Sequence, residues 1–129
     1  MALPTTNLLS MPLVQLTVDT GTNEDWLDSL KYVVSEADDD QLDLRGIEFA
    51  MEVRRSAPDN EVILRASTSD GKLHIGAPPD YGFLIISIPV EEMKYKRPGV
   101  YVADIVGSDG EYVRVCITIA LTIVEGVTR

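Results

Sequence analysis

The sequence predicts an all-β fold, an antiparallel β-sandwich of about seven to nine short strands with one short helical turn. Three observations lead to this fold class. Apolar and polar residues alternate with a period of two over most of the chain. Turn signals, among them Asp-Gly at residues 70–71 and 109–110, separate the short runs at intervals of about ten residues. The repeated amphipathic helices that a doubly wound α/β fold requires are missing from the pattern.

The chain has 129 residues, which is the size of a single domain. We expect residues 1–12 to form an extended N-terminal arm, because this stretch holds two prolines and no charge. Residues 13–129 are then one β-sandwich domain. Cys116 is the single cysteine, so an internal disulfide is excluded and a metal site would lack a second thiol.

The first strand is predicted over residues 14–19, where Val14, Leu16 and Val18 alternate with polar residues. Residues 23–34 fit two patterns. One is an amphipathic helix with Asn23 as its N-cap, and the other is a strand whose period of two only Asp28 violates. The β-branched residues at the end of the segment favour the strand.

Four further strands follow, over residues 47–53, 62–66, 73–75 and 83–88. The last of these, "FLIISI", is apolar in both phases, which is typical of a central strand covered on both faces. Pro89 is well placed to open one short helical turn within residues 89–99.

The last two strands are predicted to form a hairpin around Asp109-Gly110, a pair typical of a two-residue turn because Gly110 tolerates a positive φ. The final strand should be long and central. Its alternation predicts one buried face formed by Val113, Val115, Ile117, Ile119, Leu121 and Ile123. Cys116 lies in the opposite phase, and we expect a small buried or half-buried thiol rather than a nucleophile.

Two aromatic residues are predicted to have structural roles. Trp26 is expected in the core, as the one large anchor of a chain with 6% aromatic residues. Tyr101 follows "PGV" at a strand start, which resembles the tyrosine corner of immunoglobulin-like sandwiches, where the hydroxyl group bonds back to the preceding loop. This cue favours an immunoglobulin-like form of the predicted sandwich.

The net charge of −10 argues against binding to nucleic acid, because Lys and Arg must neutralise the phosphates. Basic residues are scattered apart from "VRR" at residues 53–55 and "KYKR" at residues 94–97. Acidic residues concentrate between positions 24 and 52, so a charged partner for that half should be basic. They are Glu24, Asp25, Asp28, Glu36, Asp38, Asp39, Asp40, Asp43, Glu48 and Glu52, against Lys31 and Arg45.

Neither a membrane segment nor a secretory signal is expected. The longest uncharged apolar run covers ten residues, from Val115 to Val124, and a spanning helix needs about twenty. A secretory signal peptide begins with positively charged residues, and this chain has no positive charge before Asp19. We expect the chain to be synthesised in the cytoplasm.

The residue pattern predicts no catalytic residue and no cofactor. His74, the only histidine, lies in the polar phase of a short strand and should face solvent. Glu91, Glu92 and Asp104 are not spaced as carboxylates that face each other across a cleft. Weak candidates for Ca²⁺ ligands are Asp38, Asp39, Asp40 and Asp43, but their spacing is not that of an EF-hand, and a flexible charged loop is the preferred interpretation.

Several segments resemble a family of small virion proteins of tailed bacteriophages and prophages with an immunoglobulin-like, baseplate-upper-protein-like β-sandwich. The similarity runs from about Gly21 to the C-terminus and rests on short motifs. They are "DLRG" at residues 43–46, Val53 with Arg54, Gly99 with Tyr101 and Asp104, and the terminal "VTR" at residues 127–129. The chain departs from the family at Ala120, near where a glycine is common, and in its acidic loop and N-terminal arm.

The resemblance implies a non-enzymatic structural component of the virion, in the tail, baseplate or fibre-attachment region. Its partners would be other virion proteins and further copies of itself. A head decoration or neck protein is one alternative. Another is a carbohydrate- or receptor-binding module that uses exposed aromatic residues, for which the candidates are Trp26, Tyr32, Tyr81, Tyr95 and Tyr112. A hydrolase acting through Asp38–Asp40 is the least favoured.

Overall fold

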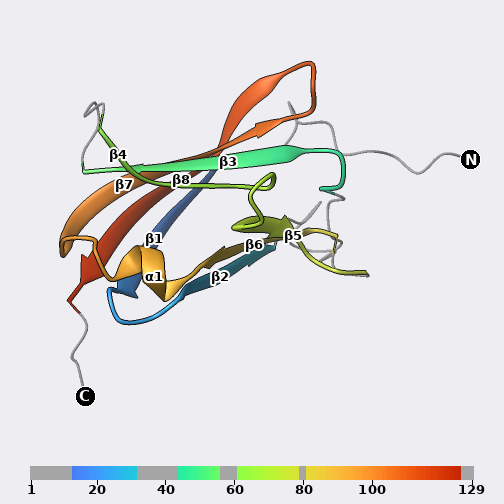
Figure 1. Cartoon of the computed structure of the whole chain (residues 1–129). Coiled ribbons are helices and arrows are strands. Elements are labelled where there is room, and N and C mark those ends of the chain that lie inside the picture. Colours follow the sequence, from blue (N-terminus) through green and yellow to red (C-terminus); the bar gives the residue numbers. More distant parts are fainter. Residues whose placement is uncertain (1–12, 32–43, 56–60, 79–80, 126–129) are drawn as a thin grey trace, which may run out of the picture.

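The computed structural model describes residues 13–31, 44–55, 61–78 and 81–125, and these form two packed β-sheets (Figure 1). The five-stranded sheet has the order β1-β8-β7-β3-β4, and the three-stranded sheet has the order β2-β6-β5. The strands are β1 (Val14–Gly21), β2 (Trp26–Lys31), β3 (Glu48–Arg54), β4 (Val62–Ser67), β5 (Leu73–Ile75), β6 (Phe83–Ile88), β7 (Gly99–Ser108) and β8 (Val113–Val124). The predicted all-β class and strand number are confirmed. The predicted arm, residues 1–12, lies outside the described residues.

The strand order is that of an immunoglobulin-like sandwich. β2, β6 and β5 correspond to strands B, E and D of that fold, and β3, β7 and β8 correspond to C, F and G. The predicted helical turn is α1 (Val90–Met93), with Pro89 at its N-cap, and it lies on the connection from β6 to β7. Its first N–H, from Val90, donates to Asp25 Oδ1 at 2.7 Å, which fastens the β1–β2 turn to the helix. Within the described ranges, no helix is long and apolar enough to cross a membrane.

One strand pair departs from the predicted antiparallel arrangement. β1 runs parallel to β8, in unbroken register from Val14 opposite Ile117 to Gly21 opposite Val124. The pairing is possible because β1 and β8 are far apart in the sequence and need no tight turn between them. It places the final strand between β1 and β7, so the expectation of a long central strand is confirmed.

The predicted buried face of β8 is wrong in its first half. Val113 and Val115 are 72% and 41% exposed, whereas Cys116 and Ile117 are both buried. The cause is a β-bulge opposite β7, where Ile105 pairs with Ile117 but Val106 pairs with Val115, so that Cys116 is the extra residue. A bulge shifts the alternation by one residue, and every apolar side chain before it changes face.

The ambiguous segment after Gly21 is a strand, as the β-branched residues favoured. Trp26 is 1% exposed, and its indole Nε1 donates to Asp28 Oδ2 at 2.6 Å. Asp28 therefore points to the same face as Trp26 and Leu30. The residue that violates the apolar alternation is the hydrogen-bond acceptor that the buried indole needs.

The expectation that β6 is covered on both faces is wrong. Leu84, Ile86 and Ile88 are buried against the five-stranded sheet, but Phe83 and Ile85 on the other face are only half-buried. β6 is the central strand of a sheet with just three strands, so its outer face has no second layer among the described residues. The core lies between the two sheets, with the largest buried side chains being Trp26, Phe49, Leu44, Met51, Leu73, Leu84, Ile86, Ile88, Met93 and Ile105.

The final hairpin has a longer turn than predicted. Ser108 pairs with Val113, so four residues rather than two connect the strands. Gly110 has φ +93°, as its predicted role requires. Asp109 Oδ1 accepts the backbone N–H groups of Tyr112 at 2.8 Å and Glu111 at 2.9 Å. These hydrogen bonds hold the pKa of the Asp109 carboxyl group below its usual value.

Candidate functional site: a basic groove and an uncharged sheet face

A groove of about 550 Å³ opens at one end of the sandwich, between the start of β4 and the loop that follows α1. Its charged lining residues are Arg55, Lys96 and Arg97 against the single acid Glu61. Tyr95 stands at the groove with 79% of its surface exposed, and Tyr101 forms part of the inner wall. We call this the basic groove.

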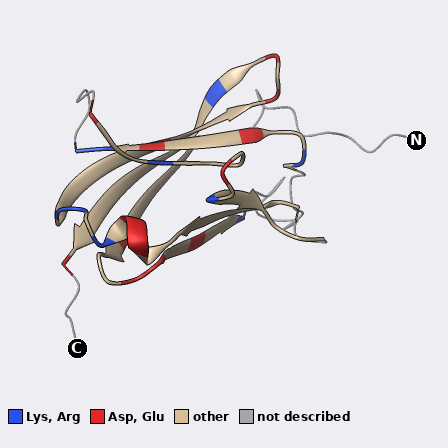
Figure 2. Ribbon diagram, in the orientation of Figure 1, with Lys and Arg blue, Asp and Glu red and all other residues tan. Residues whose placement is uncertain are grey.

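The fold brings together the two basic segments that the sequence keeps apart. Arg54 is the last residue of β3, and β3 pairs antiparallel with residues 102–108 of β7, so Arg54 lies opposite Val102, near the start of β7. The "KYKR" segment immediately precedes β7 and therefore lies beside the "VRR" segment. Figure 2 shows both as blue segments at the same end of the molecule. Spacing along the chain alone does not reveal this cluster.

The predicted tyrosine corner is present and holds the basic loop in place. Tyr101 is 3% exposed, and its hydroxyl group donates to the backbone carbonyl oxygen of Arg97 at 2.5 Å. The bond spans four residues and fixes the loop against the start of β7. The predicted structural residue Tyr101 thus also positions two cations of the groove, Lys96 and Arg97.

The positive charge of this region is unusual for the chain. Of the eleven lysines and arginines, Arg55, Lys96 and Arg97 line the groove, and Arg65 and Lys72 line an adjoining hollow that shares Lys96 and also holds Asp70 and Glu92. Some are paired with acids. Arg54 and Arg65 contact Glu52 at 2.6 and 3.3 Å, and Lys72 contacts Glu92 at 2.7 Å. Arg55, Lys96 and Arg97 are the basic side chains that line the groove itself.

A second surface feature is the outer face of β1, β8 and β7. A shallow hollow of about 620 Å³ lies there, lined on this face by Gln15, Thr17, Val102, Asp104, Thr118 and Ala120. Asp104 is the one charged side chain among the hollow's lining residues. Val100 and Val124, farther along the same strands, are 71% and 48% exposed. We call this surface the uncharged face, after the uncharged side chains around Ala120 at its centre. Asp104 and, farther along β1, Asp19 are charged side chains on the same face.

The aromatic candidates fall into different environments. Trp26 is a core residue, as predicted, and cannot serve as an exposed sugar platform. Tyr81 is half-buried, with the Arg45 guanidinium 3.9 Å from the centre of its ring. Tyr95 and Tyr112 are exposed. Tyr32 lies outside the described residues.

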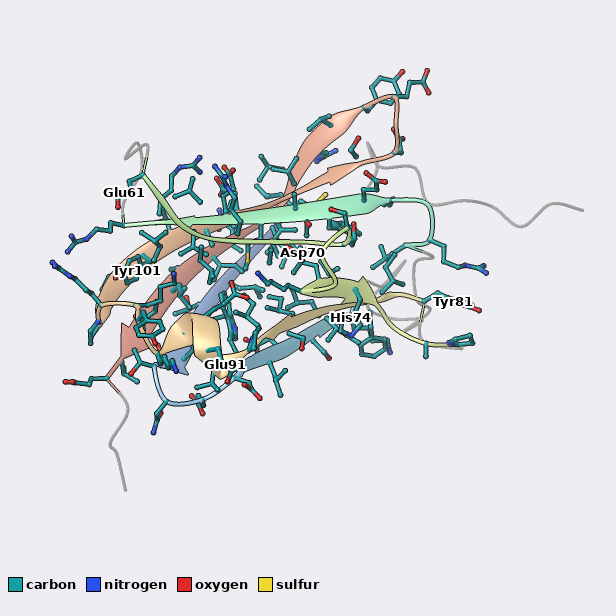
Figure 3. All side chains as sticks on the ribbon, viewed as in Figure 1. Glu61, Asp70, His74, Tyr81, Glu91 and Tyr101 are labelled. Atoms are coloured by element: carbon teal, nitrogen blue, oxygen red, sulfur yellow. The ribbon has the colours of Figure 1, made fainter. Side chains whose placement is uncertain are left out.

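The other candidate side chains do not gather into one site. His74 is exposed on β5, at the opposite end of the sandwich from Tyr101 and Glu61 (Figure 3). Glu92 is paired with Lys72, and Glu91 and Asp104 are exposed on separate elements. Within residues 13–31, 44–55, 61–78 and 81–125, no group of three His, Cys, Asp or Glu side chains could hold a metal ion. The Ca²⁺ candidates Asp38, Asp39, Asp40 and Asp43 lie outside these ranges.

Cys116 is buried, as expected, with 1% of its surface exposed. Burial raises the pKa of its thiol, and this effect outweighs the hydrogen bond from the Gly107 backbone and the charge of Arg114. We predict that the native protein reacts only slowly with a thiol reagent such as Ellman's reagent and reacts at once in concentrated guanidinium chloride. Rapid reaction of the native protein would contradict the buried bulge position.

Comparison of the sequence with protein-family models and with curated proteins gives no match.

Proposed function

We propose that this protein is a non-enzymatic structural component of a tailed-bacteriophage particle, in the tail, baseplate or fibre-attachment region. It acts through contacts with neighbouring virion proteins. The immunoglobulin-like sandwich supports the proposal, because it is the fold that the sequence resemblance implied. The observation that carries it is the uncharged face, which is a surface suited to packing against another protein.

The composition of this face favours protein contact. Across β1, β8 and β7 the outward-facing side chains that line the hollow are threonine, glutamine, valine and alanine, with Asp104 as the one charge, in a chain in which 25% of residues are charged. Interface centres are depleted of charge relative to the remaining surface. Ala120 lies at the middle of β8, opposite Thr17 on β1 and Val102 on β7. A flat partner can approach closely there, because alanine has the smallest of these side chains.

The proposal predicts that Ala120→Lys blocks incorporation into particles without unfolding the protein. Ala120 is exposed, so the substitution should change the free energy of unfolding by about 0.5 kcal/mol or less. A lysine in the hollow would hold a partner away and place a charge in the interface. The matched control is Ser29→Lys, which adds the same charge on the outer face of the other sheet.

The measurement is complementation of a phage that lacks the gene, followed by labelling of purified particles with an antibody and negative-stain imaging. We expect the label on particles made with the wild-type and Ser29→Lys chains, and its loss with Ala120→Lys. Label at the head or neck would support those alternative positions instead of the tail. Absence of the wild-type chain from intact particles would refute the proposed function.

A further inference from the structure

We propose that the basic groove binds the acidic stretch at residues 36–43 of a second copy of this chain, so that copies join head to tail. The inference deepens the proposed function and rests on it only for the presence of many copies in one assembly. Two observations carry it. One is the charge complementarity between groove and stretch, and the other is the position of Lys31 and Leu44, the described residues on either side of the stretch.

The groove is suited to carboxylates. Arg55, Lys96 and Arg97 line it against one acid, Glu61. A guanidinium group can bind a carboxylate through two parallel hydrogen bonds, and an ammonium group adds a compact charge. Tyr95 presents an exposed ring beside these cations, with the Lys94 ammonium group 5.1 Å from its centre. An extended acidic peptide could rest its backbone and methylene groups on that ring.

The chain itself supplies a complementary segment. Residues 36–43 read "EADDDQLD", with five carboxylates in eight positions and no basic residue. In a homo-oligomer this stretch is the densest negative charge that a groove can meet. The sequence predicts a basic partner for this half of the chain, and the basic groove has that chemistry.

The attachment points of the stretch favour a second copy over the same copy. The last described residue before the stretch is Lys31, and the first described residue after it is Leu44. Lys31 pairs with Phe83, and the Leu44 N–H donates to Tyr81 O at 3.0 Å, so both attachment points lie at the Tyr81 end. The groove lies at the other end, beyond β3, in the region of Tyr101 and Glu61 (Figure 3).

Chain length sets a limit on contact within one copy. Residues 32–43 must travel out and back, so even a fully extended chain reaches only about 20 Å from its attachment points. β3 alone, from Glu48 to Arg54, spans about 20 Å. The stretch would have to be taut to enter its own groove, whereas the groove of a neighbouring copy can be placed directly against it.

Head-to-tail contact has a structural consequence. Because the two contact surfaces differ, each copy keeps one free groove and one free acidic stretch, and the assembly grows into a ring or a filament. Each copy carries a net charge of −10, but at physiological ionic strength the screening length is about 8 Å. Repulsion between whole molecules is then weak, while contacts inside the groove persist.

Sedimentation velocity of the purified full chain over a range of concentrations tests the inference. We expect concentration-dependent species larger than the monomer at physiological ionic strength, and their loss at high salt. Lys96→Gln with Arg97→Gln should weaken association by about tenfold or more. Leu27→Glu with Ser29→Glu makes the same change in net charge on the exposed outer face of β2 and should leave association unchanged.

A charge exchange identifies the occupant. Lys96→Glu with Arg97→Glu, and separately Asp38→Lys with Asp39→Lys and Asp40→Lys, should each weaken self-association. A mixture of the two variants should associate again, because both pairings are then complementary. A wild-type chain that stays monomeric, or a mixture that does not associate, would overturn the inference. Both of these outcomes are measured on the purified protein, so they would overturn the self-association without deciding the particle-labelling test of the proposed function.

Discussion

Trp26→Ala is expected to lower the free energy of unfolding by about 3–5 kcal/mol, the usual cost of removing a buried tryptophan. Trp26 is 1% exposed between the two sheets, so the substitution leaves a cavity in the core. It also removes the indole donor of the inward-pointing Asp28 carboxylate. A domain of this size has a total stability of about 5–15 kcal/mol, so much of it would be lost.

Urea unfolding followed by circular dichroism measures the effect. Trp26→Phe keeps an aromatic ring but loses the hydrogen bond to Asp28, and it should be less destabilising than Trp26→Ala. This variant keeps the prediction measurable if the alanine variant does not fold. Leu27→Ala is the control, because Leu27 is 62% exposed and its loss should cost about 0.5 kcal/mol or less. A loss of less than about 1 kcal/mol for Trp26→Ala would show that Trp26 is not a core anchor.

Tyr101→Phe is expected to lower the free energy of unfolding by about 0.5–1.5 kcal/mol, the usual net contribution of one intramolecular hydrogen bond. The phenylalanine ring fills the same space, so the change isolates the hydroxyl group that donates to Arg97 O. Because this bond holds the loop that carries Lys96 and Arg97, the variant should also weaken self-association through the basic groove.

The matched control is Tyr112→Phe, in the exposed turn of the final hairpin, which should leave both properties unchanged. Urea unfolding gives the stability and sedimentation velocity gives the association. If Tyr101→Phe is as stable as the wild-type chain, the tyrosine corner does not stabilise this sandwich. If it is less stable but associates normally, the loop does not need the corner to present its cations.

Local alternation predicts most of the strands because each strand buries one face. It fails where an inserted residue shifts the phase, as at Cys116, since exposed Val113 and Val115 continue the same apolar pattern in sequence. The parallel pairing of β1 with β8 depends on contacts between the two ends of the chain, and local pattern contains no information on it. Asp28 is the converse case, a violation of the pattern that marks a buried hydrogen bond.

The candidate surfaces are less predictable because they combine distant segments. Each half of the basic groove is visible in the sequence as a short basic run, but only the pairing of β3 with β7 joins Arg55 to Lys96 and Arg97. The uncharged face needs the register of three strands, which places Thr17 and Val102 on either side of Ala120. Tyr101 could be predicted from its local context, since the tyrosine corner is formed within four residues.

Quantitative mass spectrometry of purified phage particles tests the central claim most directly. If the chain is a structural component that works through contacts with its neighbours, it will be present in purified particles in a fixed ratio of several copies to the major tail proteins. A chain that is abundant in infected cells but absent from purified particles would contradict the account.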